Sequence, residues 1–164
     1  MKATNIQWDV DGEQEARPLP DEIDIPADIA THIKHIDEIH PDHDILMGYD
    51  IGVQKKWWYG IENITFIFMG AWNDPYIGYK DYGINCHLVE DAMWDRYNDE
   101  YPAPDLQSQE YAQYSEEGFP EYMRSSKDDV FELLDDLIET LEDNISDYIS
   151  EKTGFCHKGF SISA

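Results

Sequence analysis

The sequence is poor in positive charge. Only 11 lysine and arginine residues stand against 36 aspartate and glutamate residues, so the formal net charge is −25 at pH 7. A surface of this charge is repelled by the phosphate backbone of nucleic acids and by anionic lipid headgroups. The composition therefore argues against direct binding to nucleic acid or to a membrane, and it favours partners that themselves bind nucleic acid.

Cysteine and long apolar runs are also scarce. Two cysteines, Cys86 and Cys156, are too few for a disulfide framework. Residues 1–10 contain no apolar stretch typical of a secretory signal. The longest apolar run, residues 64–72, is interrupted by Thr65 and Gly70 and is too short to cross a bilayer. These absences favour a cytoplasmic protein with reduced thiols.

The signatures of common enzyme classes are absent from the sequence. It contains no glycine-rich phosphate loop, no G-x-S-x-G, no H-E-x-x-H and no EF-hand loop. Carboxylates are abundant, but nothing singles out one pair as a general acid and base. We therefore predict a protein that is not an enzyme, needs no cofactor and acts by binding.

The chain does contain enough apolar and aromatic material for a folded core. Its 164 residues are 41% hydrophobic and 13% aromatic, which is typical of a compact domain and not of a disordered acidic tail. The clearest element is a helix predicted over residues 126–151, where apolar residues recur in steps of three and four. Its apolar stripe consists of Val130, Leu134, Leu137, Leu141, Ile145 and Tyr148. Ser126 and Asp129 have the spacing of a capping box at the start of this helix.

Shorter segments alternate between strand and helix patterns. Strand character predicts strands over residues 2–10, 23–25, 63–69, 76–79, 83–87 and 155–162. Helical spacing predicts helices over residues 27–39 and 88–97. The combination predicts an α+β fold, in which a small antiparallel sheet is packed by two to three helices and a long acidic helix lies near the C-terminus.

Three stretches of the sequence resemble a known group of proteins. KATNIQWDVDGE at the start, LPDEIDIP shortly after it and DYISEKTGFCHKGF near the end are similar to parts of small acidic proteins of bacterial mobile elements and phages, of the anti-restriction and anti-CRISPR kind. The resemblance implies a single compact unit over residues 1–164. Within it, a split small domain, residues 1–30 plus 141–164, would carry an inserted α+β domain, residues 31–140. The resemblance implies no catalytic residue.

The charged face of the long predicted helix is the main candidate site. Carboxylates three and four residues apart share one helix face, and neighbours along that face lie about 5–6 Å apart. This separation is close to the spacing of phosphates along a nucleic-acid strand. The candidate partner-binding residues are Asp128, Glu132, Asp135, Asp136, Glu139, Glu142 and Asp143. The alternative interpretation is an acidic face that only keeps the protein soluble.

Four histidines are weaker candidates for a metal site. His32, His35, His40 and His43 lie among acidic residues, and the first two would share a face of the helix predicted over residues 27–39. Their spacing matches no specific zinc motif. Histidines that relieve repulsion between carboxylates are the simpler interpretation.

The dipeptides Cys86-His87 and Cys156-His157 are a second possible set of ligands. On a strand, neighbouring side chains point to opposite faces, so the four side chains would rarely reach one ion. We therefore predict small buried thiols in a sheet at these positions.

Three functional hypotheses follow from these patterns. The first is an acidic nucleic-acid mimic that inhibits a bacterial restriction or CRISPR effector by binding its basic groove. The second is a metal-binding or small catalytic domain that uses the histidines between His32 and His43. The third is an acidic regulatory partner of one basic protein, as an antitoxin is of its toxin. The sequence leaves the target and the oligomeric state open.

Overall fold

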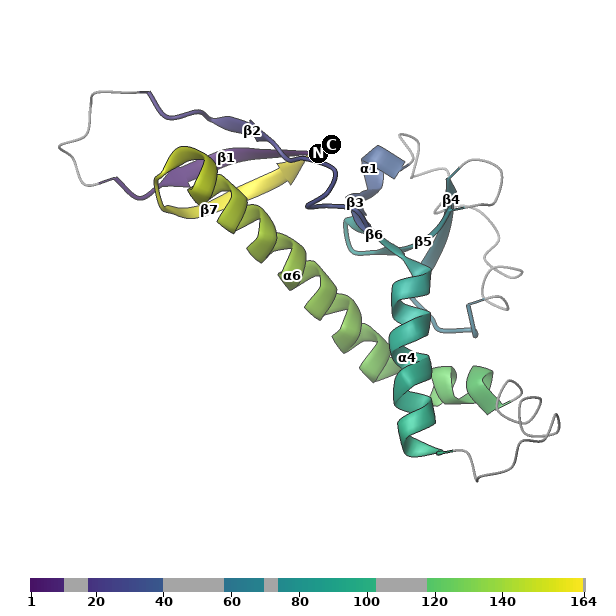
Figure 1. Ribbon diagram of the computed structural model, residues 1–164. Helices are drawn as coiled ribbons and strands as arrows, with labels where there is room; N and C mark the ends of the chain where they lie inside the picture. Colours follow the sequence, from purple (N-terminus) through teal and green to yellow (C-terminus); the bar gives the residue numbers. More distant parts are fainter. Residues whose placement is uncertain (11–17, 40–57, 70–73, 103–117, 164) are drawn as a thin grey trace.

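The computed structural model describes residues 1–10, 18–39, 58–69, 74–102 and 118–163 (Figure 1). In these residues two small antiparallel sheets pack with helices, which confirms the predicted α+β fold with a long helix near the C-terminus. No helix in the described ranges has the length and apolar character needed to cross a membrane.

The first sheet brings the two ends of the chain together. Its strand order is β2-β1-β7, with β1 over Lys2–Trp8, β2 over Glu22–Asp24 and β7 over His157–Ser163. β1 is the central strand and runs antiparallel to both neighbours. Lys2 of β1 faces Ser163 of β7, so the two termini lie side by side (Figure 1).

β1 contains an irregularity that decides which of its side chains reach the core. Ala3 and Ile6 are both buried, although strict alternation would place residues three apart on opposite faces of the sheet. The register with β7 shifts between Thr4 and Gln7, and Asn5 between them has a φ of 51°. The shift acts as a β-bulge, which turns Ile6 to the same side as Ala3.

The second sheet is formed by the middle of the chain. Its order is β3-β6-β5-β4, with β3 over Ile33–His35, β4 over Thr65–Met69, β5 over Asp74–Tyr79 and β6 over Tyr82–Asn85. Ile77 and Ile84 are direct cross-strand partners in β5 and β6, and both are fully buried. The helix α4, Cys86–Glu100, follows β6 without a loop.

The long helix α6 covers Lys127–Thr153 and confirms the helix predicted over residues 126–151. It runs from α4 at one end to the first sheet at the other (Figure 1). The buried side of α6 consists of Val130, Leu134, Ile138, Leu141, Ile145 and Ile149. The predicted capping box is wrong: the Ser126 side chain makes no capping hydrogen bond. Residues 118–125 are themselves helical and lead directly into α6, so the Ser126 N–H donates to the Tyr122 carbonyl.

One hydrophobic cluster connects α6 to both sheets. It includes Ala3 of the first sheet, Ile84 of the second and Ile145 of α6. The described strands of the first sheet come from residues 1–30 and 141–164, and those of the second come from residues 31–140. Because the core is shared, the division into a split domain and an inserted domain remains a prediction.

The helix predicted over residues 27–39 is wrong over most of its length. Ile33 lies in β3, where it pairs with Ile84, and only Ile36–Ile39 form a helix, α1. Ile33, Ile36 and Ile39 are all buried, so the apolar pattern identified core residues and not their secondary structure. Isoleucine is branched at Cβ and fits a pleated sheet at least as well as a helix, so the pairing partner determines the outcome.

α6 ends at Gly154, which has a φ of 76° and accepts the left-handed conformation that a side chain disfavours. We expect Gly154→Ala to lower the free energy of unfolding by about 1 kcal/mol, measured by urea denaturation. Gly159→Ala is the matched control, because a Cβ at either position meets no atom within 4 Å but Gly159 has no positive φ. Equal losses for both variants would contradict the role of the Gly154 backbone.

Candidate functional site on the acidic face of α6

The seven carboxylates singled out in the sequence lie on α6, and all seven are exposed. They occupy the side of the helix opposite the buried stripe, as the spacing predicts. The residues are Asp128, Glu132, Asp135, Asp136, Glu139, Glu142 and Asp143. The structure divides them into two groups with different surroundings.

Asp135 and Glu142 bind the hairpin between β5 and β6. Asp135 forms an ion pair with Lys80 and lies 3.4 Å from the Tyr79 hydroxyl oxygen. The Tyr82 hydroxyl donates to Glu142 over 3.1 Å. Burial, followed by the nearby Glu142 charge, raises the pKa of Tyr82 to about 12, so this hydroxyl remains a donor at neutral pH. These two carboxylates therefore attach α6 to the second sheet.

The other five carboxylates form a continuous row, which we call the acidic row. It consists of Asp128, Glu132, Asp136, Glu139 and Asp143. None of the five has an ion pair with a cation in the described ranges. Successive members are three or four residues apart, so their Cβ atoms lie about 5–6 Å apart along one face. Repulsion between them costs a few tenths of a kcal/mol per pair, which the burial of the apolar stripe offsets.

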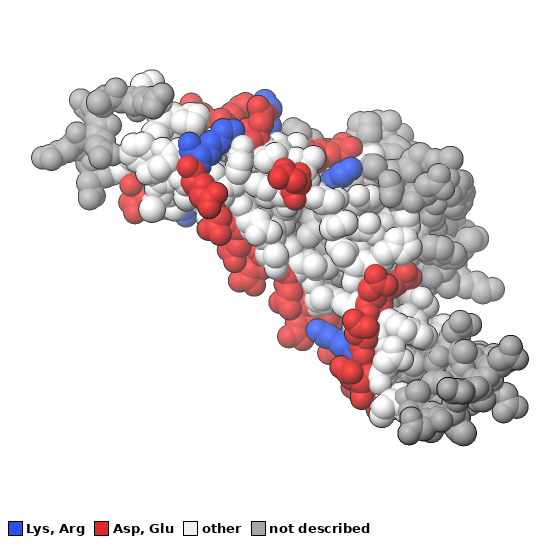
Figure 2. All heavy atoms as spheres, in the orientation of Figure 1, with Lys and Arg blue, Asp and Glu red and all other residues white. Residues whose placement is uncertain are grey.

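Acidic side chains also gather beyond α6. Figure 2 shows one red stripe along α6 and a second over α4, and the two approach each other at the end of the molecule where α4 meets α6. Asp91, Asp95 and Asp99 are exposed and recur every four residues on α4. Uncharged residues separate the two stripes over most of this face, and a basic side chain lies between them near the end where they approach (Figure 2).

Two of the four candidate histidines, His32 and His35, lie in the described residues, and the structure does not place them on a shared helix face. His32 is exposed and precedes β3, and His35 lies at the end of β3 with its Nδ1 atom 3.5 Å from an oxygen of Asp37. The helix face that the two were expected to share does not exist, because the backbone there is extended. His40 and His43 lie outside the described residues.

The two Cys-His dipeptides have different surroundings, and the prediction of two buried thiols in a sheet is wrong. Cys86 and His87 form the first turn of α4 and are not part of a strand. Cys86 is fully buried, whereas Cys156 is exposed and precedes β7. The sequence pattern did not identify Glu90 as a neighbour of Cys86 and His87. Glu90 follows Cys86 by four residues, so a helix at this position places the two side chains on one face.

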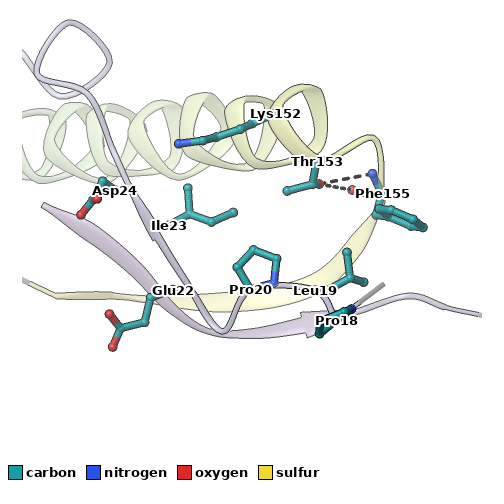
Figure 3. Close-up of a pocket in the computed structure, with 9 residues that line it drawn as sticks. All are labelled: Pro18, Leu19, Pro20, Glu22, Ile23, Asp24, Lys152, Thr153 and Phe155. Atoms are coloured by element: carbon teal, nitrogen blue, oxygen red, sulfur yellow. Dashed lines mark hydrogen bonds between the residues drawn. The ribbon is translucent and has the colours of Figure 1, made fainter. Parts of the chain in front are cut away.

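A hollow of about 440 Å³ lies at the C-terminal end of α6 (Figure 3). Pro18, Leu19 and Pro20 form one side of it, and Lys152 and Phe155 form the other. The Thr153 hydroxyl is hydrogen-bonded to the Phe155 backbone and is therefore already engaged. The hollow is shallow and mixed in polarity, and no pair of its side chains has the arrangement of a nucleophile with its base.

Comparison with known proteins returned no match to a protein family model, to a curated protein or to a solved structure. The site must therefore be interpreted from its own geometry and charge.

Proposed function

We propose that the protein is an acidic decoy that occupies the nucleic-acid groove of another protein. The observation that carries the proposal is the acidic row, five exposed carboxylates in succession without a cationic partner in the described residues. Their separation of about 5–6 Å resembles that of phosphates along a strand, so lysines and arginines that bind phosphates would meet negative charge at suitable intervals.

The support beneath the acidic row also favours this function. A mimic of a rigid duplex loses less conformational entropy on binding when its own charges are held in place. α6 is fixed by its buried stripe, and Asp135 and Glu142 attach it to the β5-β6 hairpin. The 27 residues of α6 extend over about 40 Å, roughly the length of a turn of duplex.

The class of partner follows from charge, and its biological setting follows from the resemblance of the chain ends. A net charge of −25 steers the protein toward strongly basic surfaces. The similarity of KATNIQWDVDGE and DYISEKTGFCHKGF to mobile-element proteins favours an enzyme of bacterial defence, a restriction or CRISPR effector. The same charge complementarity would also suit an acidic antitoxin that binds one basic toxin. The two proposals differ only in the partner.

The proposal is tested by competition with nucleic acid. Restriction and CRISPR effectors are each loaded with fluorescent duplex, and the purified protein is titrated in at about 50 mM and 200 mM salt. We expect displacement from at least one effector, weakened at least about tenfold at the higher salt because screening shortens the range of the attraction. Displacement from none of the panel would leave solubility as the better account of the acidic surface.

A further inference from the structure

Three different metal-ligating side chains meet at the first turn of α4. The Cys86 thiol, the His87 imidazole and the Glu90 carboxylate each contribute one donor atom, and these three atoms lie within 4.8 Å of one another. It is the one group of three such side chains in the described ranges. It lies on α4, whereas the acidic row lies on α6.

The local structure holds the three side chains at one place. The Asn85 side chain caps α4 by accepting a hydrogen bond of 3.0 Å from the His87 N–H, which fixes the backbone where the helix begins. Cys86 and Glu90 are four residues apart and so lie one above the other on the helix face. The His87 Nδ1 atom is 3.6 Å from the Oε2 atom of Glu90. No movement of the backbone is needed to bring the donors together.

The surroundings of Glu90 resemble the supporting layer of a metal site. The Tyr59 hydroxyl lies 3.3 Å from Oε1 of Glu90 and donates to it, while Oε2 faces His87. An outer hydrogen bond of this kind orients a ligating carboxylate and holds its other oxygen toward the ion. The side chains of Glu90 and His87 are 24% and 62% exposed, so solvent reaches the group from the His87 side.

The donor types narrow the choice of ion. Magnesium and calcium prefer oxygen ligands, whereas a sulfur and an imidazole nitrogen together suit zinc. Zinc binds sulfur at about 2.3 Å and nitrogen or oxygen at about 2.0–2.2 Å, so bound donors lie roughly 3–4 Å apart. The separation of 3.6 Å between His87 Nδ1 and Glu90 Oε2 lies in this range, and all three donor atoms lie within 4.8 Å of one another.

We infer that Cys86, His87 and Glu90 form a binding site for one zinc ion. The site supplies three protein ligands, which leaves one position of a tetrahedron for water or another ligand. Glu90 also lines a hollow of about 320 Å³ with Tyr59, Asp91, Trp94, Phe119 and Pro120. The positive end of the α4 dipole opposes a cation there, but two anionic ligands and the strongly negative molecule offset it.

The second Cys-His dipeptide provides an internal control. Cys156 is exposed, and the Nε2 atom of His157 lies 3.1 Å from the Ser146 hydroxyl oxygen. The neighbouring Asp9 is paired with Lys158 over 2.8 Å, and within the described residues no group of three metal-ligating side chains includes Cys156 and His157. In the part of the chain that the structure describes, the same two residue types therefore occur once with a third ligand and once without one.

The test is a cobalt titration of untagged protein, because Co²⁺ substitutes for Zn²⁺ and gives a charge-transfer absorption only when a thiolate binds it. We expect the protein to bind one Co²⁺ per chain with that absorption. One equivalent of Zn²⁺ should displace the Co²⁺ and remove the absorption. Weak binding to surface carboxylates produces no charge-transfer band. A titration without the band would overturn the inference.

Variants identify the residues that produce the charge-transfer band. Cys86→Ala is expected to abolish the band, and Cys156→Ala to retain it at full intensity. Because Cys86 is buried, the exposed His87 provides a second variant that leaves the core intact, and His87→Ala is expected to weaken Co²⁺ binding at least tenfold. Retention of the band in Cys86→Ala, its loss in Cys156→Ala, or unchanged affinity in His87→Ala would each refute this site. The decoy function needs no metal, so its competition assay stands apart from these results.

Discussion

The double variant Asp136→Lys/Glu139→Lys is expected to lose at least about 100-fold in affinity for the effector from which the wild-type protein displaces nucleic acid, or about 2.7 kcal/mol of binding free energy. Both residues lie in the acidic row and are exposed without an ion pair in the described part of the chain. Each substitution removes an attraction to the basic groove and adds a repulsion, and close charge pairs across interfaces are individually worth more than 1 kcal/mol. Fluorescence competition at low salt measures the loss.

The fold of this variant should survive, because lysine is a good helix former and both positions face solvent. Circular dichroism checks this. Asp21→Lys/Asp28→Lys is the matched control: it changes the net charge by the same amount at exposed positions outside α6, and it should retain most of the affinity. Similar losses in both variants would mean that total charge, and not the acidic row, drives binding. No loss in a folded Asp136→Lys/Glu139→Lys protein would remove the acidic row as the site.

Leu134→Ala is expected to have the largest effect on stability, a loss of about 3 kcal/mol in the free energy of unfolding. Leu134 has no exposed surface and lies in the cluster that joins α6 to both sheets. The substitution leaves a cavity that neighbours packed from several elements cannot close, so the transfer cost and the cavity cost add. Urea denaturation followed by circular dichroism measures the change.

Leu137→Ala separates the cavity effect from a general effect of shortening leucine in α6. Leu137 is only half-buried at the edge of the same stripe, so its truncation should cost less than half as much. If the two variants lose equal stability, the buried stripe is not what holds α6 in place.

The acidic row was predictable from the sequence because it depends on α6 alone. A period of three and four residues maintained from Val130 to Tyr148 specifies a helix, and the helix then fixes which carboxylates share a face. The attachment of Asp135 and Glu142 to Tyr79, Lys80 and Tyr82 was not predictable, because it depends on how α6 packs against a hairpin far away in the sequence.

The errors have the same origin. Ile33 fits a helical pattern with its neighbours, yet it pairs with Ile84, and a distant partner of this kind leaves no local signal. The sequence pattern places Cys86 and His87 at the end of a strand, which would put their side chains on opposite faces. The signal in the sequence that a helix begins there is the capping ability of Asn85.

The position of β1 between β2 and β7 has a consequence for biosynthesis. A ribosome adds about 5–20 residues per second, so β1 is made many seconds before β7. Until then one edge of β1 has no partner, and an open edge is a template for pairing with other chains. The first sheet must also close a loop of nearly the whole chain, which delays its formation. The first sheet is therefore completed only after β7 leaves the ribosome, and until then that edge of β1 stays open to other chains.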